Sequence, residues 1–110
     1  MPTATTSRIR ELNDALRTSF AGGRVVLTAG VNGLPDDVKE RAIGAVRTFA
    51  AFTPDNDPHG EHDFGAFEVD DRRFFWKIDY YDPTLAGGSD DPSDAATTAR
   101  VLTIMLAEEY

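Results

Sequence analysis

Apolar residues recur every three to four positions between residues 6 and 20, which is the spacing of one face of an α-helix. The apolar positions are Ile9, Leu12, Leu16 and Phe20, and charged side chains stand between them. The pattern predicts an amphipathic helix with one buried stripe. Two glycines follow directly, and we expect them to end the helix.

A short β-branched run, RVVLTA at residues 24–29, predicts a strand covered on both faces, and GVNG then predicts a turn. Pro35 fits the first position of a second helix, and the two aspartates after it favour the positive end of the helix dipole. We expect this helix to run to about residue 50.

The segment DFGAFEVDDRRFFWKIDYY, residues 63–81, predicts a β-hairpin whose two-residue turn is Asp70-Asp71. That turn would place Gly65 opposite Trp76 and leave room for the indole ring. One face would carry Phe67, Val69, Phe74, Trp76, Ile78 and Tyr80. The other face would carry Phe64, Ala66, Glu68, Arg73, Phe75, Lys77, Asp79 and Tyr81.

A third helix is expected after residue 91, with Asp91 as its cap and Pro92 in its first turn. Its apolar residues between 101 and 106 are too many for one narrow stripe, so the helix would be mostly buried. The expected fold is a single α+β domain over residues 1–110, in the order α-β-α-β-β-α. It would have a small, mainly antiparallel sheet of about three strands and three helices.

Charge is unevenly distributed along the chain. The net charge is −8; residues 1–50 hold seven Lys/Arg and five Asp/Glu, whereas residues 51–110 hold four and 14. The acidic second half would repel a phosphate backbone, so direct nucleic-acid binding is not expected. An acidic surface could dock on a basic protein groove.

The chain contains no cysteine, which excludes disulfides, thiolate nucleophiles and cysteine zinc sites. The first residues, MPTATTSRIREL, lack a signal-peptide pattern, and no apolar run approaches the roughly 20 residues that span a bilayer. We therefore expect a cytoplasmic protein with no membrane partner.

The stretch PDNDPHGEHD, residues 54–63 and here called the histidine loop, holds both histidines of the chain. A transition metal could be held by Asp55, Asp57, His59 and His62, because imidazole and carboxylate suit such ions. A calcium site fails, since the twelfth position of the motif is Ala66 rather than a bidentate Glu.

Acid-base catalysis is the second hypothesis for the histidine loop. His62 or His59 could move a proton, oriented by Asp63 or Glu61. Lys77 or Arg73 on the neighbouring strand would stabilise an anion. A third interpretation gives the loop no chemistry: its Asp and His side chains would only cap backbone donors before the strand. This structural interpretation is favoured, and neither a metal nor a cofactor is expected.

The second face of the hairpin is either covered by a helix or exposed to a partner, and the covered alternative is favoured because three helices are expected. Exposed aromatic and Arg side chains would be typical of a protein-binding surface. The candidate partner-binding residues are Phe64, Arg73, Phe75, Lys77, Asp79, Tyr81, Asp90 and Asp91. A free sheet edge could also form a homodimer.

Three motifs, PDNDPHGEHDFG, FFWKIDYYD and VLTIMLAEEY, resemble those of a family of small bacterial proteins catalogued as a domain of unknown function. The resemblance extends from Arg8 to Tyr110 and implies a small cytoplasmic protein that is found on mobile elements. The leading hypothesis is a non-enzymatic acidic protein-interaction module, an accessory or inhibitor of a protein partner. The alternative is a small metal-binding protein or hydrolase-like enzyme that uses the histidine loop.

Overall fold

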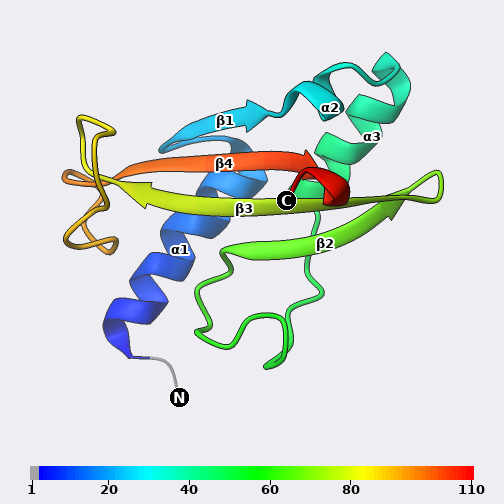
Figure 1. Ribbon diagram of the computed structural model, residues 1–110. Helices are drawn as coiled ribbons and strands as arrows, with labels where there is room; N and C mark the ends of the chain where they lie inside the picture. The colour runs from blue at the N-terminus through cyan, green and yellow to red at the C-terminus, as the bar shows by residue number, and fades with distance from the viewer. Residues whose placement is uncertain (1–2) are drawn as a thin grey trace.

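Four strands form one mixed sheet in the order β1-β4-β3-β2 (Figure 1). The computed structural model describes residues 3–110. β4 runs parallel to β1 and antiparallel to β3, and β2 and β3 form an antiparallel hairpin. The strands are β1 (Arg24–Leu27), β2 (Phe64–Val69), β3 (Arg72–Tyr81) and β4 (Ala99–Leu106). The α+β class is confirmed, although the sheet has one strand more than expected and one parallel pair.

Two longer helices cover one face of this sheet. They are α1 (Ala4–Ser19) and α3 (Asp36–Arg47), and two short helices are α2 (Ala29–Asn32) and η1 (Ala107–Glu109). Leu16 of α1 and Val46 of α3 are fully buried in one cluster with Trp76 of β3 and Ile104 of β4. The core therefore lies between the two helices and the sheet. Among residues 3–110, no helix has the length and apolar character needed to cross a bilayer.

The helix α1 buries more than its apolar stripe. Thr3 caps its first turn by accepting the N–H of Thr6, and the helix ends at Phe20, whose φ of 58° is left-handed, before the two glycines. Ile9 and Leu16 are buried as expected, but Asn13 and Arg17 are buried beside them. Buried polar groups need hydrogen-bond partners, and these two lead directly to the site described below.

The second predicted helix is confirmed as α3, with Pro35 one position before it as the N-cap. The GVNG segment, expected as a turn, lies mostly in the short helix α2. β1 is an edge strand rather than a strand covered on both faces, and its Val26 is 43% exposed.

The hairpin has the register that its turn predicted. Asp70 and Asp71 have φ values of 52° and 63°, as a two-residue turn with two left-handed positions requires. Gly65 pairs with Trp76. A Cβ atom on Gly65 would lie 2.7 Å from Cε2 of Trp76 and 2.9 Å from Cζ of Phe49, so the indole occupies the space that glycine leaves.

The expected third helix is wrong, because residues 99–106 form β4 in the middle of the sheet. A central strand can be apolar on both faces, which explains the unbroken apolar run. Leu102 and Ile104 face the helices, whereas Met105 lies on the other face and is 4% exposed. Asp91 caps a turn instead of a helix: its Oδ1 accepts the backbone N–H of Ser93 at 3.1 Å.

Candidate functional site

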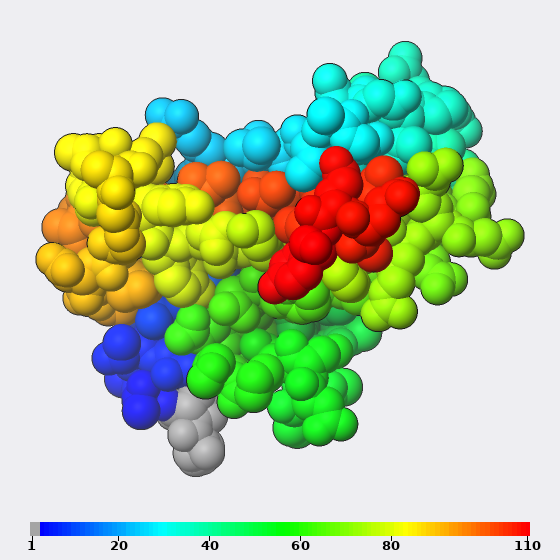
Figure 2. Space-filling view, viewed as in Figure 1, coloured from blue at the N-terminus to red at the C-terminus, as the bar shows by residue number. Residues whose placement is uncertain are grey.

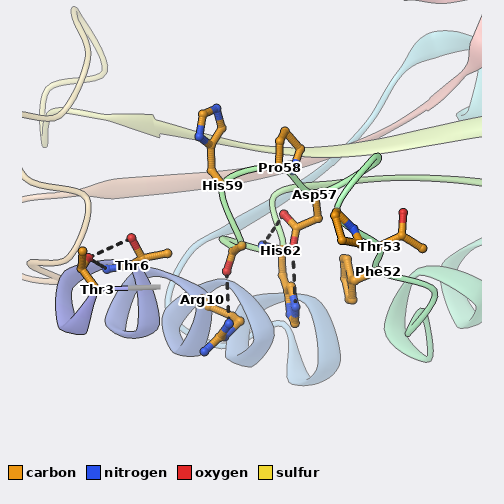
Figure 3. Close-up of a pocket in the computed structure, with 11 residues that line it drawn as sticks. Thr3, Thr6, Arg10, Phe52, Thr53, Asp57, Pro58, His59 and His62 are labelled. Carbon is orange, nitrogen blue, oxygen red and sulfur yellow. Dashed lines mark hydrogen bonds and ion pairs between the residues drawn. The ribbon is translucent and has the colours of Figure 1, made fainter. Parts of the chain in front are cut away.

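His62 fastens the histidine loop to α1. Its φ of 54° is left-handed, and its backbone N–H donates to Oδ1 of Asp57 at 3.1 Å. The ring Nδ1 lies 2.8 Å from Oδ1 of Asp14, and Nε2 lies 3.6 Å from Oδ2 of Asp57. The ring is stacked on Phe52, with centroids 3.7 Å apart (Figure 3). Both ring nitrogens thus face carboxylates, and one ring face is covered.

Asp14 connects this arrangement to α3. Its Oδ1 also accepts from Nη2 of Arg17 at 3.1 Å. Nη1 of Arg17 donates to the carbonyl oxygens of Val46, at 3.2 Å, and Phe49, at 2.7 Å. Arg17 is 4% exposed, so these carbonyls and Asp14 supply partners for Nη1 and Nη2 of a guanidinium that is almost wholly removed from water, while its buried Nε has no partner within the described residues.

A second polar network joins the loop to β3 and β4. The hydroxyl of Tyr80 donates to Oε1 of Glu61 at 2.8 Å and accepts from Nδ2 of Asn13 at 2.8 Å. Nε of Arg100 donates to Oδ1 of Asn13 at 2.9 Å. Burial of the phenol and its hydrogen bond to Glu61 raise the pKa of Tyr80, and burial lowers the pKa of Arg100. The network links Glu61 of the loop to α1, β3 and β4.

The carboxylate of Asp63 does not pair with either histidine. Within residues 3–110, no hydrogen bond or ion pair joins its carboxylate to His59 or His62, so it does not orient either imidazole. Its burial, and then the negative charge of Glu61, raise its pKa. Within the described part of the chain, Lys77 makes no hydrogen bond with the histidines either, and its Nζ pairs with Oδ2 of Asp79 at 2.8 Å. This hydrogen bond raises the pKa of Lys77.

A pocket of about 590 Å³ lies between the start of α1 and the histidine loop. Both histidines line it, but Lys77 and Asp79 do not. Of the four candidate metal ligands, only Asp57 and His62 meet, while Asp55 and His59 are exposed. Across residues 3–110 no three His, Asp or Glu side chains are grouped so that they could hold a metal ion.

The second hairpin face points away from α1 and α3, and no helix of the described chain other than η1 lies near it. We call this surface, formed by Phe64, Arg73, Phe75, Lys77, Asp79 and Tyr81, the open face. The expected covering helix is therefore wrong. η1 lies across one end of the open face (Figure 2). After it the ring of Tyr110 lies 6.0 Å from that of Phe64 and 5.4 Å from that of Phe75.

Most of the other candidate partner-binding residues are charged and lie at different distances from these rings. The guanidinium of Arg73 lies 5.5 Å from the centre of the Phe75 ring. Asp90 and Asp91 are exposed in the loop between β3 and β4, at the opposite end of the sheet from η1 (Figure 1). The structure thus brings six of the eight candidate partner-binding residues onto one surface and places the other two at its end.

Residues 27–109 match the model of a family described as "Protein of unknown function (DUF3768)". The chain belongs to the DUF3768 family. This assignment confirms the resemblance drawn from the three motifs. The matched part of this DUF3768 protein includes the histidine loop and the open face, whereas Asp14 and Arg17 lie before it. The comparisons with curated proteins and with solved structures gave no match.

The partners of His62 were not identified from the DUF3768 sequence. Asp14 was only one of several charged residues on a predicted helix, and Phe52 only a residue before a loop. One signal was present: Asn13 and Arg17 are four positions apart and flank Leu16, so they border the buried stripe. Such positions are candidates for buried polar residues, but their partners depend on the tertiary fold.

Proposed function

We propose that this DUF3768 protein is a non-enzymatic interaction module that binds a protein partner through the open face. The observation that supports the proposal is the asymmetry of the sheet. One face buries Phe74, Trp76 and Ile78 beneath α1 and α3, whereas the other carries half-buried aromatic side chains beneath only η1 and Tyr110. Aromatic residues together with Arg are enriched at the centres of protein interfaces.

The charges near the open face favour a partner with a basic rim. Residues 82–94, at one end of the sheet, contain four Asp and no Lys or Arg. Glu108 is exposed in η1 near the other end. An apolar patch with acidic ends is complementary to an apolar patch surrounded by Lys and Arg. The same acidic residues would repel nucleic acid.

Two observations support a non-enzymatic role. Nδ1 of His62 is hydrogen bonded to Asp14, and Nε2 faces Asp57 at 3.6 Å, so both ring nitrogens are directed at carboxylates of the chain itself. Asp63 and Lys77, two further residues of the catalytic hypothesis, do not line the pocket, whereas His59 does. We also propose a cytoplasmic location, with which the cysteine-free sequence is compatible.

We also propose that two copies can associate through β2. This strand is at the end of the sheet order, and its six residues FGAFEV include neither Pro nor Lys, which often protect exposed edges. Antiparallel pairing of two β2 strands would bury both free edges about a two-fold axis.

The partner hypothesis is tested with a charge exchange that keeps the local ion pair. In Lys77→Glu/Asp79→Lys the charges of the open face are exchanged, and in the matched control Arg8→Glu/Glu11→Arg an ion pair on α1 is exchanged. Proteins retained by each tagged chain from a lysate of the source cells are identified, purified and titrated by calorimetry. The proposal requires a partner that binds the wild type and the control but binds the open-face variant at least about tenfold more weakly. Equal binding to all three chains would refute it.

A further inference from the structure

The pocket beside the histidine loop has two different walls. Thr3, Thr6 and Arg10, at positions i, i+3 and i+7, form a polar stripe of α1 that lines one side. The loop side is lined by apolar rings, chiefly Phe52, Pro54 and Pro58 (Figure 3). Its volume of about 590 Å³ falls within the range of small-molecule pockets.

Arg10 is the charged group of this pocket that is free to bind a ligand. Its Nη1 and Nη2 make only long hydrogen bonds, at 3.5 Å to the carbonyl oxygen of Gly60 and at 3.4 Å to Oγ of Ser7. No carboxylate pairs with it among residues 3–110. The one carboxylate of the lining, Asp57, is 8% exposed and directs both oxygens at His62. The lining thus holds one Arg and one buried Asp, and the guanidinium of Arg10 is the charge that a ligand in the pocket can reach.

We propose that the pocket binds a small organic anion whose carboxylate or phosphate is carried on a flat apolar body. The anionic group would accept hydrogen bonds from the guanidinium of Arg10, which has five N–H donors in a planar fork. The hydroxyl of Thr6 adds a donor, since Thr3 already donates its own proton to Thr6 at 3.0 Å. The flat body would lie against Pro54 and Pro58, because the Phe52 ring is already stacked on His62. The pocket is built from α1 and the loop, so it is independent of the proposed protein partner.

The full chain is titrated by calorimetry with phenyl phosphate, benzoate, inorganic phosphate and benzyl alcohol. We expect saturable binding of phenyl phosphate or benzoate, and the tighter of the two identifies the preferred head group. Arg10→Gln should weaken that binding at least about tenfold, because a charge-assisted hydrogen bond is lost. Arg24→Gln, which removes an exposed Arg of β1, should leave it unchanged.

The proposal is overturned by a lack of saturation with either aromatic anion, by equal binding of the ligand to wild type and Arg10→Gln, or by equal affinity for benzyl alcohol. Inorganic phosphate binding as tightly as phenyl phosphate would remove the role of the apolar wall and refute the stated ligand class. Thermal melting of each variant establishes that it is folded. If Arg10→Gln does not fold, Thr6→Val replaces it, because valine keeps the shape of threonine and removes the donor. None of these results bears on the open face.

Discussion

The imidazole of His62 is hydrogen bonded through Nδ1 to Oδ1 of Asp14 at 2.8 Å, across 48 positions of the chain. The contact joins the histidine loop to the middle of α1 and holds the imidazole against that helix. The two histidines of the loop therefore differ: His62 is a partly buried structural residue, whereas His59 is exposed on the pocket wall.

Replacing His62 with Ala should lower the free energy of unfolding by about 2–3 kcal/mol, because it removes a charge-assisted hydrogen bond and the stacking on Phe52. His59→Ala is the matched control and should change it by less than about 0.5 kcal/mol, as exposed positions commonly do. Urea unfolding followed by Trp76 fluorescence measures both. Equal losses for the two variants would show that His62 has no special structural role.

Gly65→Ala should destabilise the protein by about 1–3 kcal/mol, since the new methyl group would overlap the Trp76 ring and meet Cζ of Phe49 at 2.9 Å. Gly44→Ala is the control, because a Cβ atom there meets nothing within 4 Å and the residue lies inside α3. Alanine is the better helix former, so the control should gain up to about 1 kcal/mol. Chemical denaturation measures the free energy of unfolding of both variants. A Gly65→Ala variant as stable as the wild type would contradict the prediction.

Asp63→Asn should raise the melting temperature at neutral pH. Burial raises the pKa of Asp63 in the folded state, so the native protein holds this proton more tightly than the unfolded chain does. The contribution of Asp63 to the stability of the folded state therefore falls as the pH rises from the unfolded pKa, near 4, through the folded pKa. Above both pKa values the buried, ionised carboxylate destabilises the folded state. The advantage of Asn should shrink as the pH falls towards and below 4, which calorimetric melts across this range would detect. A constant difference at every pH would contradict this cause.

Ala66→Pro should prevent the proposed β2 association and leave the hairpin intact. The N–H of Ile78 donates to the carbonyl of Asp63, so by alternation the N–H of Ala66 points away from β3 to the free edge. Proline removes this donor, whereas the control Ala66→Ser retains it. Sedimentation equilibrium should show self-association of the wild type and the Ser variant only. A monomeric wild type at its highest soluble concentration would refute the pairing.

The hairpin and its register could be predicted because both are determined by residues that are close together in the sequence. The pair Asp70-Asp71 defines the turn, and each later cross-strand pair, including Gly65 with Trp76, follows by counting. The segment VLTIML was misassigned because a short apolar run fits either a buried helix or a central strand. β-branched residues and the brevity of the run, only residues 101–106, favoured the strand, but its neighbours β1 and β3 are distant in sequence.

The chemistry of the site was less predictable than its location. The histidine loop stood out by composition, yet the residues that decide its role, Asp14 and Phe52, reach it only through the packing of α1 and the segment before the loop. The open face was predicted residue by residue from strand alternation. Whether a helix covered it depended on the third helix, and its replacement by β4 left the face without that cover.

The position of β4 also has a consequence for synthesis. β4 is the last of the four strands along the chain, yet it lies between β1 and β3, and Arg24 pairs with Val101. During translation, β1 therefore has no neighbouring strand until residues 99–106 have left the ribosome. Until then the β2–β3 hairpin also lacks its pairing with β4. Pairings between distant segments form slowly and leave apolar surface accessible in the meantime. Nascent chains of this protein should accordingly expose Trp76 and its apolar neighbours to chaperones until the final strand inserts.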